Sequence, residues 1–147
     1  MERTLVLVKP DGVQRRLTGT IIERFERKGL FIRALKLMAI STEMAERHYA
    51  VHKGKPFFND LIEYITSGPI VAMILEGNNA ISTVRTMSGA TDGSRAQPGT
   101  IRGDFCTGIQ NNIVHASDSQ ESFEHESVIF FSNGEILDCR YMDEELV

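Results

Sequence analysis

RTLVLVK, residues Arg3–Lys9, contains an uninterrupted aliphatic run, Leu5–Val8, between polar ends. A short apolar run of this kind is typical of a buried strand. Pro10 follows at once and cannot donate a backbone hydrogen bond, and Asp11-Gly12 is typical of a turn. We therefore predict a strand over Arg3–Lys9 that lies centrally in a sheet and ends at Pro10.

Helix and strand patterns alternate along the rest of the chain. Thr20-x-x-Glu23 resembles a capping box for a helix that ends at Gly29, and Ser41 with Glu43 is typical of the start of another helix. Periodicity predicts further strands at Leu30–Ile40, at Ile70–Leu75 and ending at His115, and further helices at Phe58–Ile65, from Asn78 or Asn79 to near Gly89, and from about Ser119 onward. Residues 90–112 show little periodicity and predict a long loop, which is more often functional than not. This order is compatible with a parallel or an antiparallel sheet.

Composition places the chain among soluble globular proteins. A length of 147 residues predicts a single domain, 1–147, and an apolar content of 41% with 24% charged residues is ordinary. No apolar run approaches the roughly 20 residues that span a bilayer, and no signal-peptide cleavage pattern follows the N-terminal run. A cytoplasmic location without membrane partners is therefore expected. Cys106 and Cys139 are too few and too far apart to predict a metal cluster or a disulfide framework.

Charge is distributed unevenly along the chain. Residues 1–55 carry twelve Lys and Arg against six acids, whereas residues 56–147 carry four against fourteen. Isolated arginines in an acidic region suit anion binding, because a guanidinium matches phosphate geometry, although solvated surface charge is the simpler interpretation of any one of them. The net charge of −4 argues against a dedicated nucleic-acid binder. Single-strand nucleic-acid binding by the basic N-terminal part stays open.

The usual phosphate-binding and metal-binding motifs are absent from the sequence. We find no G-x-x-x-x-G-K-[ST], no G-x-G-x-x-G and no H-E-x-x-H. His48 and His52 are spaced to lie on one face of the helix that begins at Ser41, but no third ligand has a telling spacing. The sequence therefore predicts no protein-held metal.

His115 is the strongest candidate for chemistry. Near neutral pH an imidazole keeps a lone pair on one nitrogen and can attack phosphorus directly, provided that an acceptor holds the N–H of the other nitrogen. Glu126 lies seven residues into the helix that begins at Ser119, on the flank of its apolar stripe, and could fold back to serve as that acceptor. The alternative is a strand-end histidine that merely bonds a capping serine, and spacing alone slightly favours this alternative.

Three cations could complete a phosphate site around this histidine. Arg85 and Arg102 could neutralise and align a polyphosphate, as phosphoryl transfer requires, and Lys9 ends a strand where a side chain can reach a pocket rim. Each could instead be a solvated surface residue. Tyr49 and Phe57 could belong to the core or to the pocket.

Five stretches, in order, resemble the nucleoside diphosphate kinase family and cover nearly the whole chain. They are VKPDGVQR, HYAVHKGKPFF, TSGPIVAMILEG, PGTIRGDF and NIVHASDS. The resemblance implies an α+β, ferredoxin-like sandwich with a four-stranded antiparallel sheet covered by helices. It also implies reversible, ping-pong transfer of the γ-phosphoryl group from a nucleoside triphosphate to a nucleoside diphosphate, with low base selectivity. Mg2+ would enter on the nucleotide phosphates.

The resemblance also implies a role for each matching residue. His115 matches the phosphorylated nucleophile, Glu126 the carboxylate that orients it, and Ser117 a hydroxyl near the ring. Arg85, Thr91 and Arg102 match the residues that bind the phosphates, and His48 lies close to them. Lys9 and Asn112 match residues that reach the ribose, and Lys9 and Tyr49 also lie near the transferring group. Phe57 and Ile109 match the apolar residues that hold the base. An inactive binding module is the alternative, but such a module usually lacks at least one of these residues.

Two positions depart from the family pattern. Thr91-Asp92-Gly93 stands where Thr-Asn-Pro is frequent, and Gly93 is expected to loosen the backbone there and to weaken subunit contacts. Ala116 follows the histidine where glycine is common. The family forms hexamers or tetramers, so the resemblance implies a homo-oligomer, with a hexamer favoured.

Overall fold

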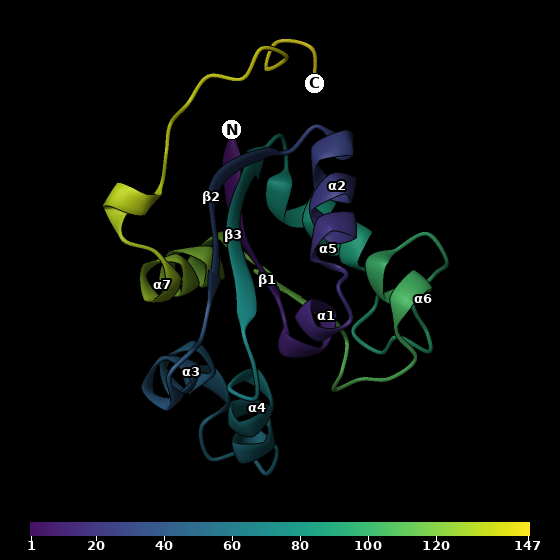
Figure 1. Ribbon diagram of the computed structural model, residues 1–147, viewed down its shortest axis with the longest axis vertical. Helices are drawn as coiled ribbons and strands as arrows, with labels where there is room; N and C mark the ends of the chain where they lie inside the picture. The colour runs from purple at the N-terminus through teal and green to yellow at the C-terminus, as the bar shows by residue number, and fades with distance from the viewer.

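The computed structural model describes residues 1–147 and contains one four-stranded sheet (Figure 1). The strands are β1 (Glu2–Val8), β2 (Phe31–Met38), β3 (Ile70–Gly77) and β4 (Val114–Ala116), in the spatial order β2-β3-β1-β4. Every neighbouring pair is antiparallel, which decides between the two sheet types that the sequence allowed. β1 lies in the interior of the sheet, as its apolar run predicts.

Helices cover both faces of this sheet, which is the ferredoxin-like α+β arrangement. They are α1 (Pro10–Gln14), α2 (Thr18–Lys28), α3 (Thr42–His48), α4 (Phe58–Ile65), α5 (Ala80–Ser88), α6 (Ile101–Phe105) and α7 (Gln120–Phe130), with short 3-10 turns at Ala50–His52 and Asn133–Glu135. Figure 1 shows α7 on one side of the sheet and α2 and α5 on the other. None of these helices combines the length and the apolar character that a bilayer crossing requires.

The period of two along β1 divides the core into two layers. Leu5 and Leu7 belong to a cluster that includes Phe130 of α7, whereas Val6 and Val8 belong to a second cluster that includes Phe25 of α2. All four β1 side chains are fully buried, because successive residues of a strand point to opposite faces and both faces are covered.

Several local predictions are confirmed by the backbone. The Ser41 side chain accepts a hydrogen bond from the Met44 N–H at the start of α3, and the Ser119 side chain accepts one from Ser122 at the start of α7. Gly29 ends α2 with a φ of 95°, a left-handed conformation that suits glycine. Both cysteines are free thiols.

Other local predictions are wrong. Pro10 starts the short helix α1 instead of a turn, because proline without its N–H is well suited to a first helical position. The predicted capping box at Thr20 does not form, since α2 begins at Thr18 without a side-chain cap. Within the loop predicted for residues 90–112, the Thr100 hydroxyl accepts from the Gly103 N–H and caps α6. The helix that begins after Ser41 ends at His48, so His52 does not share a helical face with His48 and lies in the following 3-10 turn.

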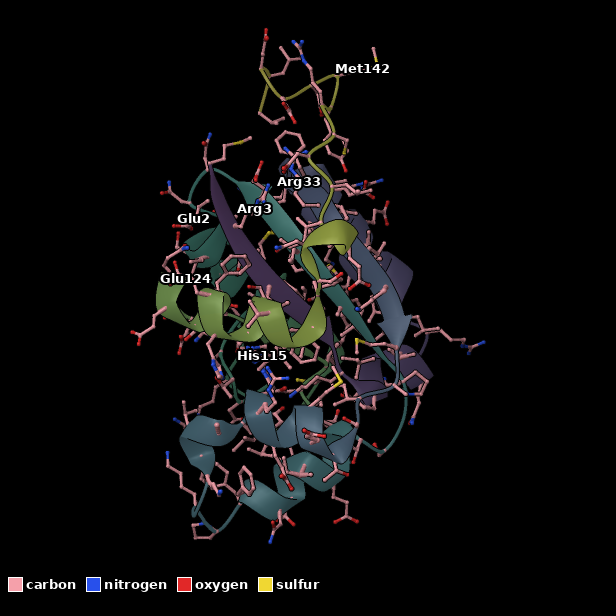
Figure 2. All side chains as sticks on the ribbon, turned by 90° about the vertical axis from the view of Figure 1, so that its left-hand side faces the viewer. Glu2, Arg3, Arg33, His115, Glu124 and Met142 are labelled. Carbon is pink, nitrogen blue, oxygen red and sulfur yellow. The ribbon has the colours of Figure 1, made fainter.

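The C-terminal tail beyond α7 is largely irregular but is tied to β2. Leu137 N–H donates to the Arg33 carbonyl at 2.8 Å, and the Tyr141 hydroxyl donates to the Ile32 carbonyl at 2.6 Å. The Arg33 guanidinium, only 5% exposed, contacts Glu76 of β3 at 2.8 Å and Glu144 of the tail at 2.9 Å. Figure 2 shows Arg33 where the tail runs past the sheet.

Candidate active site

Side chains from six helices and strands or their ends surround a hollow of about 460 Å³. Nine of the twelve residues that the family resemblance assigns to the site line it: Lys9, Tyr49, Phe57, Arg85, Thr91, Arg102, Ile109, Asn112 and His115. The other three, His48, Ser117 and Glu126, lie behind His115 and are buried. The volume lies within the range of small-molecule sites.

His115 is held by an acidic partner from α7. Its Nε2 lies 2.6 Å from Oε2 of Glu126, and the Ser117 hydroxyl donates to Oε1 of the same carboxylate at 2.6 Å. A carboxylate only accepts, so Nε2 carries the hydrogen and Nδ1 keeps its lone pair. The imidazole therefore bonds Glu126 and not a capping serine. Figure 2 shows His115 between α7 and the α3 region.

Local structure explains how these side chains meet. His115 lies opposite Leu7 of β1 in the antiparallel register, which places it on the short edge strand β4. Ser119 then caps α7, and two helical turns bring Glu126 back beside the strand.

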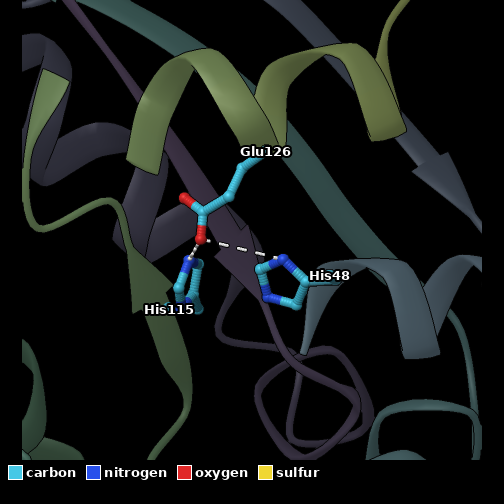
Figure 3. Close-up of side chains that lie close together, drawn as sticks. All are labelled: His48, His115 and Glu126. Carbon is cyan, nitrogen blue, oxygen red and sulfur yellow. Dashed lines mark hydrogen bonds and ion pairs between the residues drawn. The ribbon is translucent and has the colours of Figure 1, made fainter. Parts of the chain in front are cut away.

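His48 of α3 lies on the other side of the same carboxylate (Figure 3). Its Nδ1 is 3.7 Å from Glu126 Oε2, and its ring meets that of His115 edge to face with centroids 4.6 Å apart. The side chain is only 1% exposed, and neither ring nitrogen has a hydrogen-bond partner. Burial, together with the neighbouring His115, lowers the pKa of His48 well below its ordinary value, so His48 is neutral.

The hollow is lined by cations that have no acidic partner. The buried Arg102 guanidinium donates to the carbonyls of Asn112, Gly89 and Val114 at 3.2, 2.9 and 2.7 Å, and Arg85 donates to the Ala116 carbonyl at 3.3 Å. Neither arginine nor Lys9 forms an ion pair with a carboxylate. Burial, and then the charge of Arg102, lowers the pKa of Lys9 to about 8.

This uncompensated positive charge suits an anionic ligand beside His115. Buried charges are normally paired, because each ion that leaves water without a partner costs several kcal/mol. A phosphate group in the hollow would supply the missing negative charge. The arrangement can therefore hold a phosphate next to a histidine with a free lone pair.

The sequence model of the family described as nucleoside diphosphate kinase matches residues 2–136. The chain belongs to the nucleoside diphosphate kinase family. It is 66% identical to the nucleoside diphosphate kinase of Thermoplasma volcanium over 144 residues, with 98% of each chain covered. It is 67% identical to that of Picrophilus torridus over 138 residues, covering 94% of this chain and all of the relative.

Solved structures agree with this assignment. The halophilic nucleoside diphosphate kinase of Halobacterium salinarum, determined in complex with CDP, superposes with a TM-score of 0.95 at 46% identity, covering 98% of this chain and 96% of that one. The enzyme of Aquifex aeolicus gives a TM-score of 0.89 at 43% identity, covering 92% and 99%. As a member of this kinase family, the chain is a phosphotransferase that acts on nucleotides.

The mouth of the hollow in this kinase is apolar on two sides. Phe57 is 45% exposed and Ile109 is 63% exposed, although both are large apolar side chains. Asn112 donates from Nδ2 to the Thr91 carbonyl at 3.0 Å, while its buried Oδ1 has no partner. Burial, and then the charge of Glu126, raises the pKa of Tyr49 to about 12, so its hydroxyl stays protonated.

Some lining residues were not singled out from the sequence. Asp60, Leu61 and Gln110 also line the hollow. The helical spacing placed Leu61 on an apolar stripe but did not distinguish a core position from a pocket wall. Only the tertiary structure, which places α4 and residues 109–112 around the same hollow, reveals that difference. His52 also lines the hollow, from the 3-10 turn, and does not belong to the group formed by His48, His115 and Glu126.

Gly93 is packed tightly in this member of the family, against our expectation that it loosens the backbone. A Cβ on Gly93 would lie 2.1 Å from Cys106 Sγ and 2.7 Å from the Cys106 carbonyl oxygen. The Gly93 N–H donates to the Gly108 carbonyl at 2.8 Å. Glycine here allows close contact between two parts of the long loop.

Proposed function

We propose that this chain transfers the γ-phosphoryl group of a nucleoside triphosphate to a nucleoside diphosphate through a phosphohistidine at His115. One observation carries the proposal: a histidine with a free Nδ1 lone pair borders a nucleotide-sized hollow that holds three cations without acidic partners. The family assignment supports the same conclusion.

The chemistry uses the two nitrogens of His115 in different ways. The Nδ1 lone pair attacks the γ-phosphorus, the new N–P bond forms, and the bond to the β–γ bridging oxygen breaks as the diphosphate leaves. Glu126 accepts the Nε2 hydrogen bond at 2.6 Å and stabilises the positive charge that develops on the ring. A second diphosphate then attacks the same phosphorus in reverse, which makes the reaction ping-pong and reversible.

The remaining residues position the nucleotide or the machinery. We assign Arg85, Thr91 and Arg102 to the phosphates, Lys9 and Asn112 to the ribose, Lys9 and Tyr49 to the transferring group, and Phe57 and Ile109 to the base. A base gripped by apolar side chains is held without reading its edges, which supports low base selectivity. Ser117 and His48 do not line the hollow. The Ser117 hydroxyl donates to Glu126, so we assign it to holding the carboxylate, and His48 packs beside the same carboxylate without a hydrogen bond to it.

Magnesium fits this site only as an ion carried by the nucleotide. Asp60 is the one carboxylate that lines the hollow, and the other charged lining groups are Lys9, Arg85 and Arg102. Mg2+ prefers several oxygen ligands, which the nucleotide phosphates and water can supply. When bound, the ion would neutralise phosphate charge, while the three protein cations orient the same phosphates.

We also propose that the chain is a single cytoplasmic domain, residues 1–147, that works as a homo-oligomer, with a hexamer favoured over a tetramer. The free thiols of Cys106 and Cys139 support a reducing compartment. The edge strand β2 exposes Leu35 and Leu37 by 46% and 66%, which supports a subunit contact. Native mass spectrometry would measure the number of subunits.

The test is phosphorylation of the protein by γ-labelled ATP with Mg2+ and no acceptor. We expect one label per chain that is lost in acid and kept in alkali, and none in His115→Ala. His125→Ala is the matched control, because His125 is an exposed histidine on the same α7 helix, and it should keep the label. An unchanged exchange of phosphate between ATP and a second diphosphate in His115→Ala would overturn the proposal.

A further inference from the structure

Three potential metal ligands converge behind the hollow. The ligand atoms of His48, His115 and Glu126 all lie within 4.8 Å of one another, although they come from α3, β4 and α7. Figure 3 shows both imidazoles directed at the same carboxylate oxygen. The sequence spacing paired His48 with His52, whereas the fold pairs it with His115 and Glu126.

His48 provides an independent observation that points to a ligand. Its side chain is 1% exposed, and both nitrogens lack a hydrogen bond. A buried polar group without a partner costs roughly 1–3 kcal/mol, so such groups are rare in folded proteins. The proposed phosphoryl transfer does not need an unpaired lone pair on His48. A cation bound between His48 and Glu126 would satisfy it.

We propose that His48, His115 and Glu126 form an inhibitory site for a transition-metal ion of the Zn2+ class. Two imidazoles and one carboxylate are a ligand set that zinc accepts, with a fourth position left for water. Mg2+ prefers a shell of oxygen ligands, so this site selects against the ion that accompanies the nucleotide. The site is therefore separate in chemistry from the magnesium of the reaction.

The distances require only a small adjustment. Tetrahedral zinc with bonds of about 2.0–2.1 Å places its ligand atoms roughly 3.4 Å apart. His48 Nδ1 and Glu126 Oε2 are already 3.7 Å apart, whereas His115 Nε2 and Oε2 must separate from 2.6 Å as the ion replaces the hydrogen bond. The Ser117 hydroxyl holds Oε1 at 2.6 Å and orients the carboxylate, as outer partners of metal ligands commonly do.

An ion can reach this cluster from the side of α7, through a hollow that adjoins the nucleotide hollow and shares Arg85 and His115 with it. This second hollow of about 170 Å³ is lined by all three ligands and by Asp118, Ser122 and His125 of the α7 region. Arg85 also lines this entrance, and the Asp118 carboxylate beside it offsets that charge and would attract a divalent cation.

The inhibitory effect rests on the proposed role of His115. The metal takes the lone pair of Nε2, and the proton that Nε2 carried moves through water to Nδ1. No lone pair then remains on Nδ1 to attack phosphorus, and Glu126 no longer supports the ring. Zinc should therefore prevent formation of the phosphohistidine.

Metal binding is tested first on the intact protein without nucleotide. Zinc X-ray absorption on the equimolar complex should show two imidazoles and oxygen ligands, and Co2+ should give the visible spectrum of a four- or five-coordinate site. His48→Gln and Glu126→Gln should each weaken Co2+ binding by at least about tenfold, whereas His52→Gln and His125→Gln should not. The site would be overturned by sulfur ligands in the absorption spectrum, by the absence of imidazole ligands, or by an equal loss of Co2+ affinity in His52→Gln. The absorption measurement uses the wild-type protein, so it tests the site even if a variant fails to fold.

Inhibition is tested by labelling with γ-labelled ATP and excess Mg2+ after exposure to Zn2+. Zinc should reduce the labelling rate of wild type at least tenfold, and a chelator should restore it. The ratio of rates with and without zinc should approach one in His48→Gln. If zinc binds to these ligands but labelling continues at the same rate, the inhibitory role is overturned and the metal site stands. If the wild-type protein is not labelled even without zinc, the result counts against the proposed function.

Discussion

At the scale of single residues, the site depends on charges that the fold leaves without partners. Arg102 bonds three carbonyl oxygens, which fix its geometry and neutralise none of its charge. Lys9 lies in the same hollow and is 8% exposed. The protein thus keeps a binding site ready for an anion at some cost to its own stability, as preorganised electrostatic sites do.

The first residue-scale prediction concerns pH. Because the pKa of Lys9 is lowered to about 8, the free enzyme loses this cation as the pH rises above 8. Bound phosphate favours the charged lysine, so ADP affinity should fall above pH 8, by up to about tenfold per pH unit. The terminal phosphate of ADP, with a pKa of about 6, is already ionised in this range. Titration calorimetry from pH 7 to 10 measures the effect.

Two variants isolate the contribution of Lys9 to this pH profile. Lys9→Gln should bind ADP more weakly at pH 7 and show a flat profile above pH 8. Lys36→Gln removes a partly exposed lysine that pairs with Glu135, far from the hollow, and should keep the wild-type slope. Equal slopes in Lys9→Gln and wild type would contradict the assignment.

At the scale of secondary-structure elements, the start of α7 sets the position of the Glu126 carboxylate. The Ser119 hydroxyl accepts from the Ser122 N–H at 3.1 Å, and Glu126 lies two turns further on. This cap was predicted from the sequence because its signal is local. By contrast, α6 was missed, since its cap, Thr100, lies within a Gly- and Asp-rich segment of weak periodicity.

Removal of the α7 cap should destabilise the protein. Ser119→Ala leaves the Ser122 N–H without its acceptor and should lower the free energy of unfolding by about 1 kcal/mol. Ser119→Asp restores an acceptor and should remain within about 0.5 kcal/mol of wild type. Urea denaturation measures both variants. Equal losses in the two would show that the hydroxyl does not act as a cap.

At the scale of the whole molecule, Arg33 joins the sheet to the C-terminal tail. Its guanidinium contacts Glu76 at 2.8 Å and Glu144 at 2.9 Å, and it also donates to the Cys139 carbonyl. Burial would raise the pKa of Glu76, but hydrogen bonds from Arg3 and Arg33 outweigh it and hold that pKa below its ordinary value. The tail is thereby fixed against the β2 side of the sheet.

Loss of this contact should destabilise the fold and release the tail. Arg33→Met should lower the free energy of unfolding by about 3 kcal/mol, because it breaks a buried charge pair and leaves its acids with fewer partners. Hydrogen exchange should increase over residues 137–146. Arg27→Ala is the control, since its pair with Glu23 is 80% and 55% exposed and should contribute at most about 0.5 kcal/mol. A similar loss in both variants would contradict the role of the tail contact.

The amino-acid sequence by itself determined the elements whose signals are local. The apolar run of β1, the serine caps of α3 and α7, and the glycine at the end of α2 depend on residues within a few positions of one another. The family motifs added the identity of the candidate site residues. None of these signals shows which side chains meet across the fold.

Only the tertiary structure decided the antiparallel order of the strands and the environment of each site residue. His115 and Glu126 are 11 positions apart and His48 lies 67 positions before His115, yet one carboxylate oxygen is close to both rings. The burial of Lys9 and the unpartnered nitrogens of His48 also follow from packing. Such contacts depend on strand register and on how α3 and α7 pack together, and these are properties of the whole chain rather than of any short stretch.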